Sequence, residues 1–237
     1  MALPVMSTPT YELTVPSSKQ KVKFRPFLVK EEKALLIAQQ SEDQSIMLDT
    51  LKNVIKTCTS NKLDVEKLAM FDIEYIFTQL RARSVGEMSE LIFSCLECND
   101  PKAKMHVNID LTTLEVKFNE EHTNVIKLFN DVGVKMKYPG LSLINKMKDA
   151  PKGDVALVFD VVIECIDSIF DEENVYPAHE QTKEELEDFI NNLTQEQFVK
   201  VQRFFETMPK LEKDIEFDCP VCNHHHKHTI QGLDSFF

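Results

Sequence analysis

Two short segments of the 237-residue chain share one pattern: an aromatic residue, a spacer, Cys-x-x-Cys and an asparagine. The first is FSCLECND at 93–100, and the second is FDCPVCNH at 217–224. Each motif offers two thiolates from one tight turn, and two such turns complete the tetrahedron of a structural Zn²⁺ ion. The residues predicted to share this metal ion are Cys95, Cys98, Cys219 and Cys222.

Strand-like sequence surrounds both motifs. Residues 87–98 and 105–111 flank the first motif, and residues 214–233 repeat the pattern around the second. The two hairpins match a zinc ribbon whose halves are separated by a long insertion. Four thiolates close the coordination shell, so the zinc is expected to be structural and not catalytic.

The cysteine pattern has three other interpretations. A redox pair of the thioredoxin type opens a helix, whereas strand-like sequence follows both motifs here. Chance thiols are expected at core spacing, where Cys58 and Cys165 lie in their helical patterns. In the third interpretation, histidines of the C-terminal hairpin replace cysteine ligands, although a solvated loop would also explain them. The histidines in question are His224, His225, His226 and His228.

The composition indicates a globular chain, because 43% of the residues are hydrophobic and 28% are charged. A formal net charge of −12 makes nucleic acid and anionic membranes disfavoured partners. The sequence has no apolar stretch long enough for a membrane span and no signal-peptide pattern at its N-terminus. We therefore expect the chain in the cytoplasm, where thiols stay reduced and paired cysteines bind metal.

The spacing of apolar residues predicts an α+β fold, with a largely helical body, small β-hairpins and the split zinc-ribbon-like knuckle pair. Period-two alternation predicts a strand with one basic face near 19–25, and residues 125–138 predict a hairpin that turns at 130–133. Asp72 is expected to cap the third helix. Helices are expected within 30–40, 45–58, 71–87, 154–170, 182–193 and 194–208, and the last two open with the capping boxes Thr182/Glu185 and Thr194/Gln197.

Three regions are predicted. Residues 1–87 form an N-terminal strand and helical region, and 88–111 with 214–237 form the split zinc-ribbon-like unit. Residues 112–213 form an inserted hairpin and helical region. The sequence lacks the nucleotide-binding, nucleophile-elbow and zinc-protease motifs, and its five glycines are too few for a phosphate-binding loop, so no enzyme is predicted.

KVKFRPFLVKEEKALL at 21–36, FDIEYIFTQLRARSVGE at 71–87 and the paired cysteines together resemble the T4-like bacteriophage baseplate hub assembly protein family. The signature positions are RPFLVKEEK at 25–33 and FDIEY at 71–75. The resemblance covers most of the chain and brings no catalytic residues. It implies a protein that takes part in assembling the hub at the centre of a contractile-tail baseplate.

The resemblance therefore implies a non-enzymatic, chaperone-like assembly factor that binds phage baseplate hub proteins in the cytoplasm of the infected bacterial host. The alternative is a structural baseplate subunit that stays in the virion. A lower alternative is a zinc-ribbon nucleic-acid-binding module that uses the basic strand from Lys19 to Arg25 with Lys30, although these few cations form a small basic face.

Overall fold

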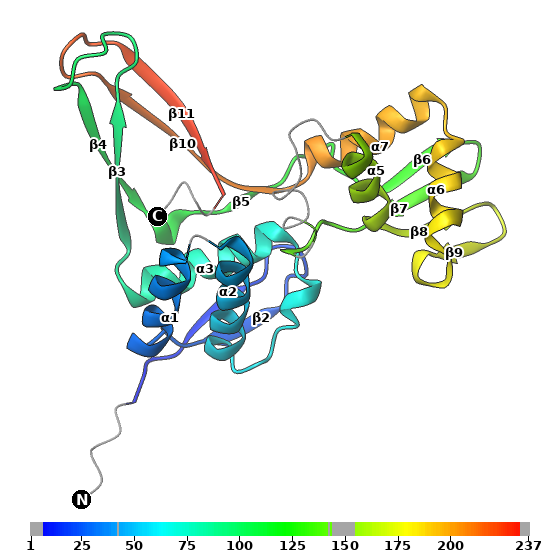
Figure 1. The fold of residues 1–237 in the computed structure, drawn as a ribbon, viewed down its shortest axis with the longest axis horizontal. Coiled ribbons are helices and arrows are strands. Elements are labelled where there is room, and N and C mark those ends of the chain that lie inside the picture. Colours follow the sequence, from blue (N-terminus) through cyan, green and yellow to red (C-terminus); the bar gives the residue numbers. More distant parts are fainter. Residues whose placement is uncertain (1–6, 42, 142, 144–154, 233–237) are drawn as a thin grey trace, which may run out of the picture. The chain divides into compact units, whose positions relative to one another are not determined.

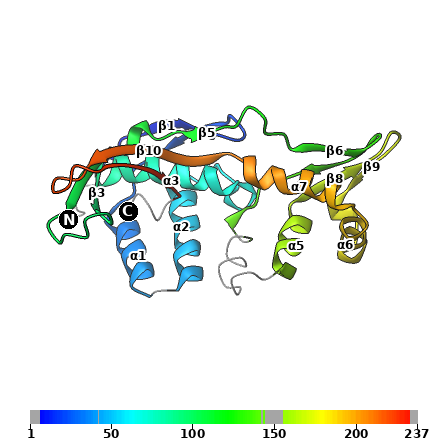
Figure 2. The ribbon, with the colours of Figure 1, turned by 90° about the horizontal axis from the view of Figure 1, so that it is seen from above.

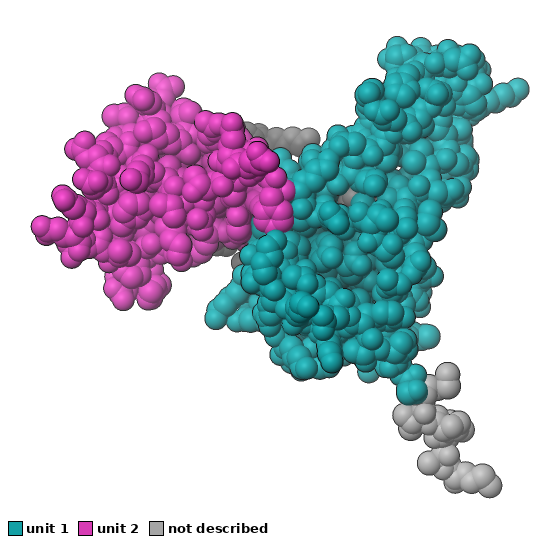
Figure 3. All heavy atoms as spheres, turned by 180° about the vertical axis from the view of Figure 1, so that it is seen from behind, with its two compact units in different colours: residues 1–117, 210–237 teal, residues 118–209 magenta. Residues whose placement is uncertain are grey.

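The computed structural model describes residues 7–41, 43–141, 143 and 155–232, and it combines helices with antiparallel strands (Figure 1). This mixture agrees with the expected α+β class. The chain divides into two compact units, one made of residues 1–117 and 210–237 and the other of residues 118–209 (Figure 3). The second unit is thus inserted into the first.

The first unit begins with a hairpin of strands β1 (Tyr11–Thr14) and β2 (Lys21–Phe24). Burial alternates along β2, where Val22 and Phe24 are buried and the lysines between them are exposed. The prediction of a strand with one basic and one apolar face is therefore confirmed.

Three helices follow: α1 (Val29–Gln40), α2 (Gln44–Cys58) and α3 (Met70–Ser84). Asp43 caps α2, because its carboxylate accepts the backbone N–H groups of the first turn. One apolar stripe of α3 is buried: Ile73, Ile76, Phe77 and Leu80 are all less than 9% exposed.

The two cysteine-containing hairpins complete the first unit. One consists of β3 (Met88–Ser94) and β4 (Lys104–Asp110), and the other of β10 (Lys210–Asp218) and β11 (His225–Gln231). Strand β10 also pairs with the short β5 (Val116–Lys117). Apolar residues of both hairpins share one core, and the hairpins turn at the same end of the unit (Figure 1). Of the predicted segment 214–237, residues 233–237 lie outside the described chain.

The second unit is built on a four-stranded antiparallel sheet in the order β6-β7-β8-β9. Its strands are β6 (Val125–Phe129), β7 (Val132–Met136), β8 (Ile166–Phe170) and β9 (Val175–Pro177). The turn between β6 and β7 passes through Asn130 at φ 45°, where the hairpin was predicted.

Three described helices pack their apolar residues into one core with this sheet (Figure 2). They are α5 (Val155–Glu164), α6 (Lys183–Asn191) and α7 (Gln195–Thr207). Both predicted capping boxes are present, one at the start of α6 and one at the start of α7.

The prediction of one helix over 154–170 is wrong in its second half. The helix ends at Glu164, and Ile166–Phe170 forms strand β8. The switch occurs at Cys165, whose carbonyl accepts the N–H of Lys137 at 2.7 Å, and from there the chain pairs with β7. The body is therefore less helical than expected, since strand pairing overrides a short run whose apolar spacing suits either structure.

Candidate metal centre

The same backbone conformation follows the cysteine pair in both hairpins. Asn99, directly after Cys98, has φ 49°, and Asn223, directly after Cys222, has φ 57°. Among residues with a side chain, asparagine is one of the few that adopt this left-handed conformation readily. The asparagine repeated in both motifs thus has one conformational role, which is to turn the chain out of each Cys-x-x-Cys knuckle.

Backbone hydrogen bonds fix the first cysteine of each pair. The N–H of Cys95 donates to the carbonyl of Ala103 at 3.0 Å, and the N–H of Cys219 donates to that of His224 at 2.9 Å. The N–H of Val221 also points at the sulfur of Cys219, with N and Sγ 3.4 Å apart. Such N–H···S contacts within the turn stabilise a thiolate and orient it.

The four sulfurs form a compact group. Cys95 Sγ lies 3.8 Å from Cys222 Sγ, Cys98 Sγ lies 3.8 Å from Cys219 Sγ, and all four lie within 4.8 Å of one another. Zn–S bonds of about 2.3 Å in a tetrahedron place sulfurs about 3.8 Å apart. Disulfide sulfurs are only about 2.0 Å apart. The spacing fits four ligands of one metal ion and is too long for disulfide bonds.

The group is buried on one side and open on the other. Cys95 and Cys219 are 2% and 0% exposed and pack with Ala103 and Met105, whereas Cys222 is exposed. A metal ion held here would have an apolar floor and a path to solvent past Cys222. Four thiolates would leave it no open position for a substrate or an activated water.

The electrostatics of the four thiols favour a bound cation. The backbone N–H groups of Cys222 and Val221 lower the pKa of Cys219 to about 7. At Cys222 the N–H of His224 favours the thiolate, yet desolvation and the neighbouring thiols raise the pKa to about 12. Several thiolates this close together would repel one another, so the thiols do not all ionise without a cation. A bound metal cation would offset the repulsion between the thiolates.

From His225 on, the histidine-rich segment forms strand β11, so the expectation of a loop is wrong there. His224, His225 and His228 are exposed to solvent, as expected. His225 Nδ1 lies 2.7 Å from Asp218 Oδ1, and His228 stacks on Phe217. His226 Nε2 lies 3.3 Å from the sulfur of Cys95. Among the residues that the structure describes, the group of potential ligands contains the four cysteines and no histidine.

The other two cysteines lie apart from this group, as predicted. Cys58 and Cys165 are each 1% exposed. Burial raises the pKa of Cys58 to about 11 and that of Cys165 to about 12. Both are neutral thiols at physiological pH, which suits packing better than metal binding.

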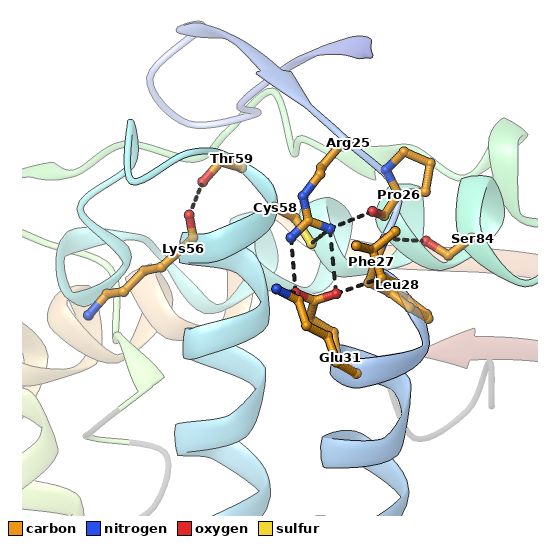
Figure 4. Close-up of polar contacts among 10 residues, drawn as sticks. Arg25, Pro26, Phe27, Leu28, Glu31, Lys56, Cys58, Thr59 and Ser84 are labelled. Atoms are coloured by element: carbon orange, nitrogen blue, oxygen red, sulfur yellow. Dashed lines mark hydrogen bonds and ion pairs between the residues drawn. The ribbon is translucent and has the colours of Figure 1, made fainter. Parts of the chain in front are cut away.

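The signature segment 25–33 forms a polar brace at the start of α1 (Figure 4). Arg25 Nη2 donates to Glu31 Oε1 at 2.9 Å, and the backbone N–H of Leu28 donates to Glu31 Oε2 at 2.7 Å. Arg25 Nη1 also donates to the carbonyl of Pro26 at 2.8 Å. Glu31 is only 7% exposed, so this carboxylate holds the strand–helix junction together and does not face a ligand.

The second signature segment, 71–75, contributes a similar brace. Asp72 is fully buried and accepts hydrogen bonds from the backbone N–H and the hydroxyl of Ser17, at 2.9 and 2.5 Å. It therefore ties the β1–β2 turn to α3. The prediction that Asp72 caps α3 is wrong, because Ala69 occupies the N-cap position and the helix begins at Met70.

The Asp72–Ser17 brace and the His226–Cys95 contact join residues that are distant in the chain, and periodicity carries no information on such pairs. The Arg25–Glu31 brace spans only six positions, but it was not predicted from the sequence either. In the described part of the chain, no helix is long and apolar enough to cross a membrane.

Two comparisons with known proteins both point to phage baseplate proteins. A family model described as "T4 bacteriophage base plate protein" matches residues 8–237. Over 228 residues the chain is 24% identical to the "Baseplate hub assembly protein gp26" of Enterobacteria phage T4, covering 96% of this chain and 97% of that protein. No solved structure gives a significant match. Neither the family description nor the relative's name refers to an enzyme.

Proposed function

Because this chain belongs to the T4 bacteriophage base plate protein family, we propose that it is a non-enzymatic assembly factor for the central hub of a contractile-tail baseplate. The observation that carries the proposal is the similarity to a hub assembly protein over 96% of the chain. The similarity extends through both compact units, so it is not confined to the cysteine hairpins or to any other single module.

In this proposal the protein acts as a chaperone: it binds hub subunits while they associate, in the cytoplasm of the infected bacterium. Its net charge of −12 favours partners with basic surfaces. Charges at the rim of an interface mainly raise the association rate and are screened by salt. Binding that weakens as salt rises is therefore expected.

We further propose that Cys95, Cys98, Cys219 and Cys222 hold one structural Zn²⁺ ion. The sulfur spacing, the paired knuckles and the buried floor support this assignment. The ion would join the β3–β4 hairpin in the middle of the chain to the β10–β11 hairpin at its end. It would thus contribute binding free energy to the folding of the first unit, as in other structural zinc sites.

Affinity purification of the tagged chain from cells infected with its phage tests the proposed function. Hub proteins are expected to co-purify while tails assemble, and mass spectrometry of purified virions should detect little or none of the chain. Stoichiometric copies in virions would instead support the structural subunit, which the description "base plate protein" favours. If no hub protein co-purifies with the chain, both the chaperone and the structural-subunit versions of the assembly role are contradicted.

A further inference from the structure

His226 lies outside the two knuckles, yet it makes a polar contact with the four-sulfur group: its Nε2 lies 3.3 Å from the sulfur of Cys95. We propose that His226 donates an N–H···S hydrogen bond to the metal-bound thiolate of Cys95 and so raises the affinity of the site for a thiophilic metal ion, without being a ligand. This inference rests on the metal site proposed above.

The direction of the hydrogen bond follows from the chemistry of the sulfur. A thiolate bound to a metal has no proton, so it can only accept. The ring must therefore carry its proton on Nε2, the atom that faces Cys95. Four thiolates around a divalent ion leave a net charge of −2, and each donor to a sulfur offsets part of that charge.

The sulfur of Cys219 has a backbone donor, because the N–H of Val221 points at it with N and Sγ 3.4 Å apart. At Cys95 the donor is a side chain, the imidazole of His226. This donor can be changed by substitution, whereas the backbone donor cannot.

Packing holds the imidazole in place. His226 lies opposite Phe217 in the β10–β11 register, and the two rings stack with their centroids 5.4 Å apart. The rings of His224 and His226 are packed edge to face, with their centroids 4.7 Å apart. The ring of His228 stacks with that of His226, and these centroids are 5.9 Å apart. The ring is therefore oriented before a metal ion binds, which is what a positioning residue requires.

The geometry also distinguishes a donor from a ligand. The four cysteine sulfurs lie within 4.8 Å of one another, and among the described residues no histidine nitrogen belongs to that group. His226 contacts one corner of the tetrahedron, and the four sulfurs already supply the full coordination number of a structural zinc ion.

Three variants of the full chain test the inference. His226→Phe keeps an aromatic ring on Phe217 but removes the donor, and His226→Gln removes the ring but keeps an N–H. His228→Phe is the matched control, because His228 stacks on the same Phe217 from the same strand. Circular dichroism of each variant checks that the fold is retained.

Zinc affinity is measured by competition with a chelator at one pH. His226→Phe should lower it about 10-fold, within the range usual for a lost donor to a metal ligand. His226→Gln should retain more of the affinity than His226→Phe, and His228→Phe should match the wild type. Equal affinities of His226→Phe and wild type would overturn the inference.

Spectroscopy separates a donor from a ligand. Cobalt(II) and ¹¹³Cd²⁺ bound to the wild-type chain should report four sulfur ligands, and the His226 Nε2–H should show scalar coupling to ¹¹³Cd through the hydrogen bond. A nitrogen ligand that disappears in His226→Phe would show that the residue binds the metal directly and would refute the donor role. A wild-type chain that binds neither zinc nor cadmium would refute the metal site itself, and hub binding would then be judged separately.

Discussion

The sulfur atoms of Cys98 and Cys219 lie 3.8 Å apart, although the two residues are separated by 121 positions in the sequence. Between them the chain completes the whole second unit, residues 118–209. A metal ion at this point would therefore close a loop far longer than either hairpin. Its contribution to stability is expected to be local to the first unit, because the second unit has its own apolar core.

Substitution of one ligand tests this directly. Cys219→Ser should abolish tight binding of one equivalent of zinc, because three thiolates leave the tetrahedron incomplete. The β10–β11 hairpin should fray, while most of the helical signal in far-ultraviolet circular dichroism should remain. Cys58→Ser is the control, since Cys58 is buried away from the sulfur group and the variant should keep its zinc. Zinc loss in the control but not in Cys219→Ser would contradict the assignment.

Removing and restoring the metal should change the two units differently. With a chelator, hydrogen exchange is expected to accelerate in β3–β4 and β10–β11 but to stay slow in the β6–β9 sheet. Free zinc at 100 times its Kd should stabilise the folded first unit by about 2.7 kcal/mol relative to the metal-free form. Equal acceleration in both units would show that the metal supports the whole chain and not one unit.

The Arg25–Glu31 brace predicts both a mutational and a pH effect. Glu31→Ala should lower the free energy of unfolding by about 2–3 kcal/mol, because it removes hydrogen bonds between a buried carboxylate and charged or backbone donors. Glu32→Ala is the matched control, since Glu32 is the exposed neighbour on the same helix. Chemical denaturation of both variants gives the comparison, and equal losses would exclude a special role for Glu31.

For the pH effect, burial opposes ionisation of Glu31, but the hydrogen bonds from Arg25 and Leu28 hold its pKa below the ordinary 4.5. A lowered pKa in the folded state means that the stabilisation is fully present above 4.5 and is lost as the pH falls through the folded-state pKa. The wild type should therefore lose more stability than Glu31→Ala during acidification below that value. Parallel acid titrations of the two proteins would argue against the brace.

Asp72 predicts the opposite pH dependence. Burial raises its pKa above 3.8 despite the hydrogen bonds from Ser17, so stability should fall as the pH rises from 3.8 through the folded-state pKa. Asp72→Asn keeps an oxygen acceptor for the N–H of Ser17 and should cost less than about 1 kcal/mol, whereas Asp72→Ala should cost about 1–3 kcal/mol. Denaturant titrations at neutral pH measure both. An asparagine variant as unstable as the alanine variant would show that the charge is required.

The sequence predicted the parts of the fold that depend on local pattern. The knuckles, the alternating strand at Val22 and Phe24, and the two capping boxes each involve residues a few positions apart, where backbone geometry alone decides the outcome. The two Cys-x-x-Cys motifs also predicted the sulfur group, because each motif has a partner with the same flanking residues.

Other features depend on contacts that periodicity does not encode. Ile169 fits a helical stripe with the residues before it, yet it pairs with Val134 in a sheet. Asp72 lies in the first turn of α3, where local rules assign it to that helix, but its partner is Ser17. In the sequence nothing distinguishes His226 from the neighbouring histidines. Only the structure, with its β10–β11 pairing, shows that His226 contacts Cys95. In each case a distant segment decides which of several local options forms.

The insertion of the second unit between the two knuckles has a consequence for synthesis on the ribosome. At about 5–20 residues per second, Cys219 is translated roughly 6–24 s after Cys98, because 121 positions separate them. During that interval the nascent chain carries two thiols of an incomplete cluster, while residues 118–209 are already available to fold. A product truncated before Cys219 can never assemble the four sulfurs, so a closed cluster distinguishes a chain translated past Cys222 from one that stops before Cys219.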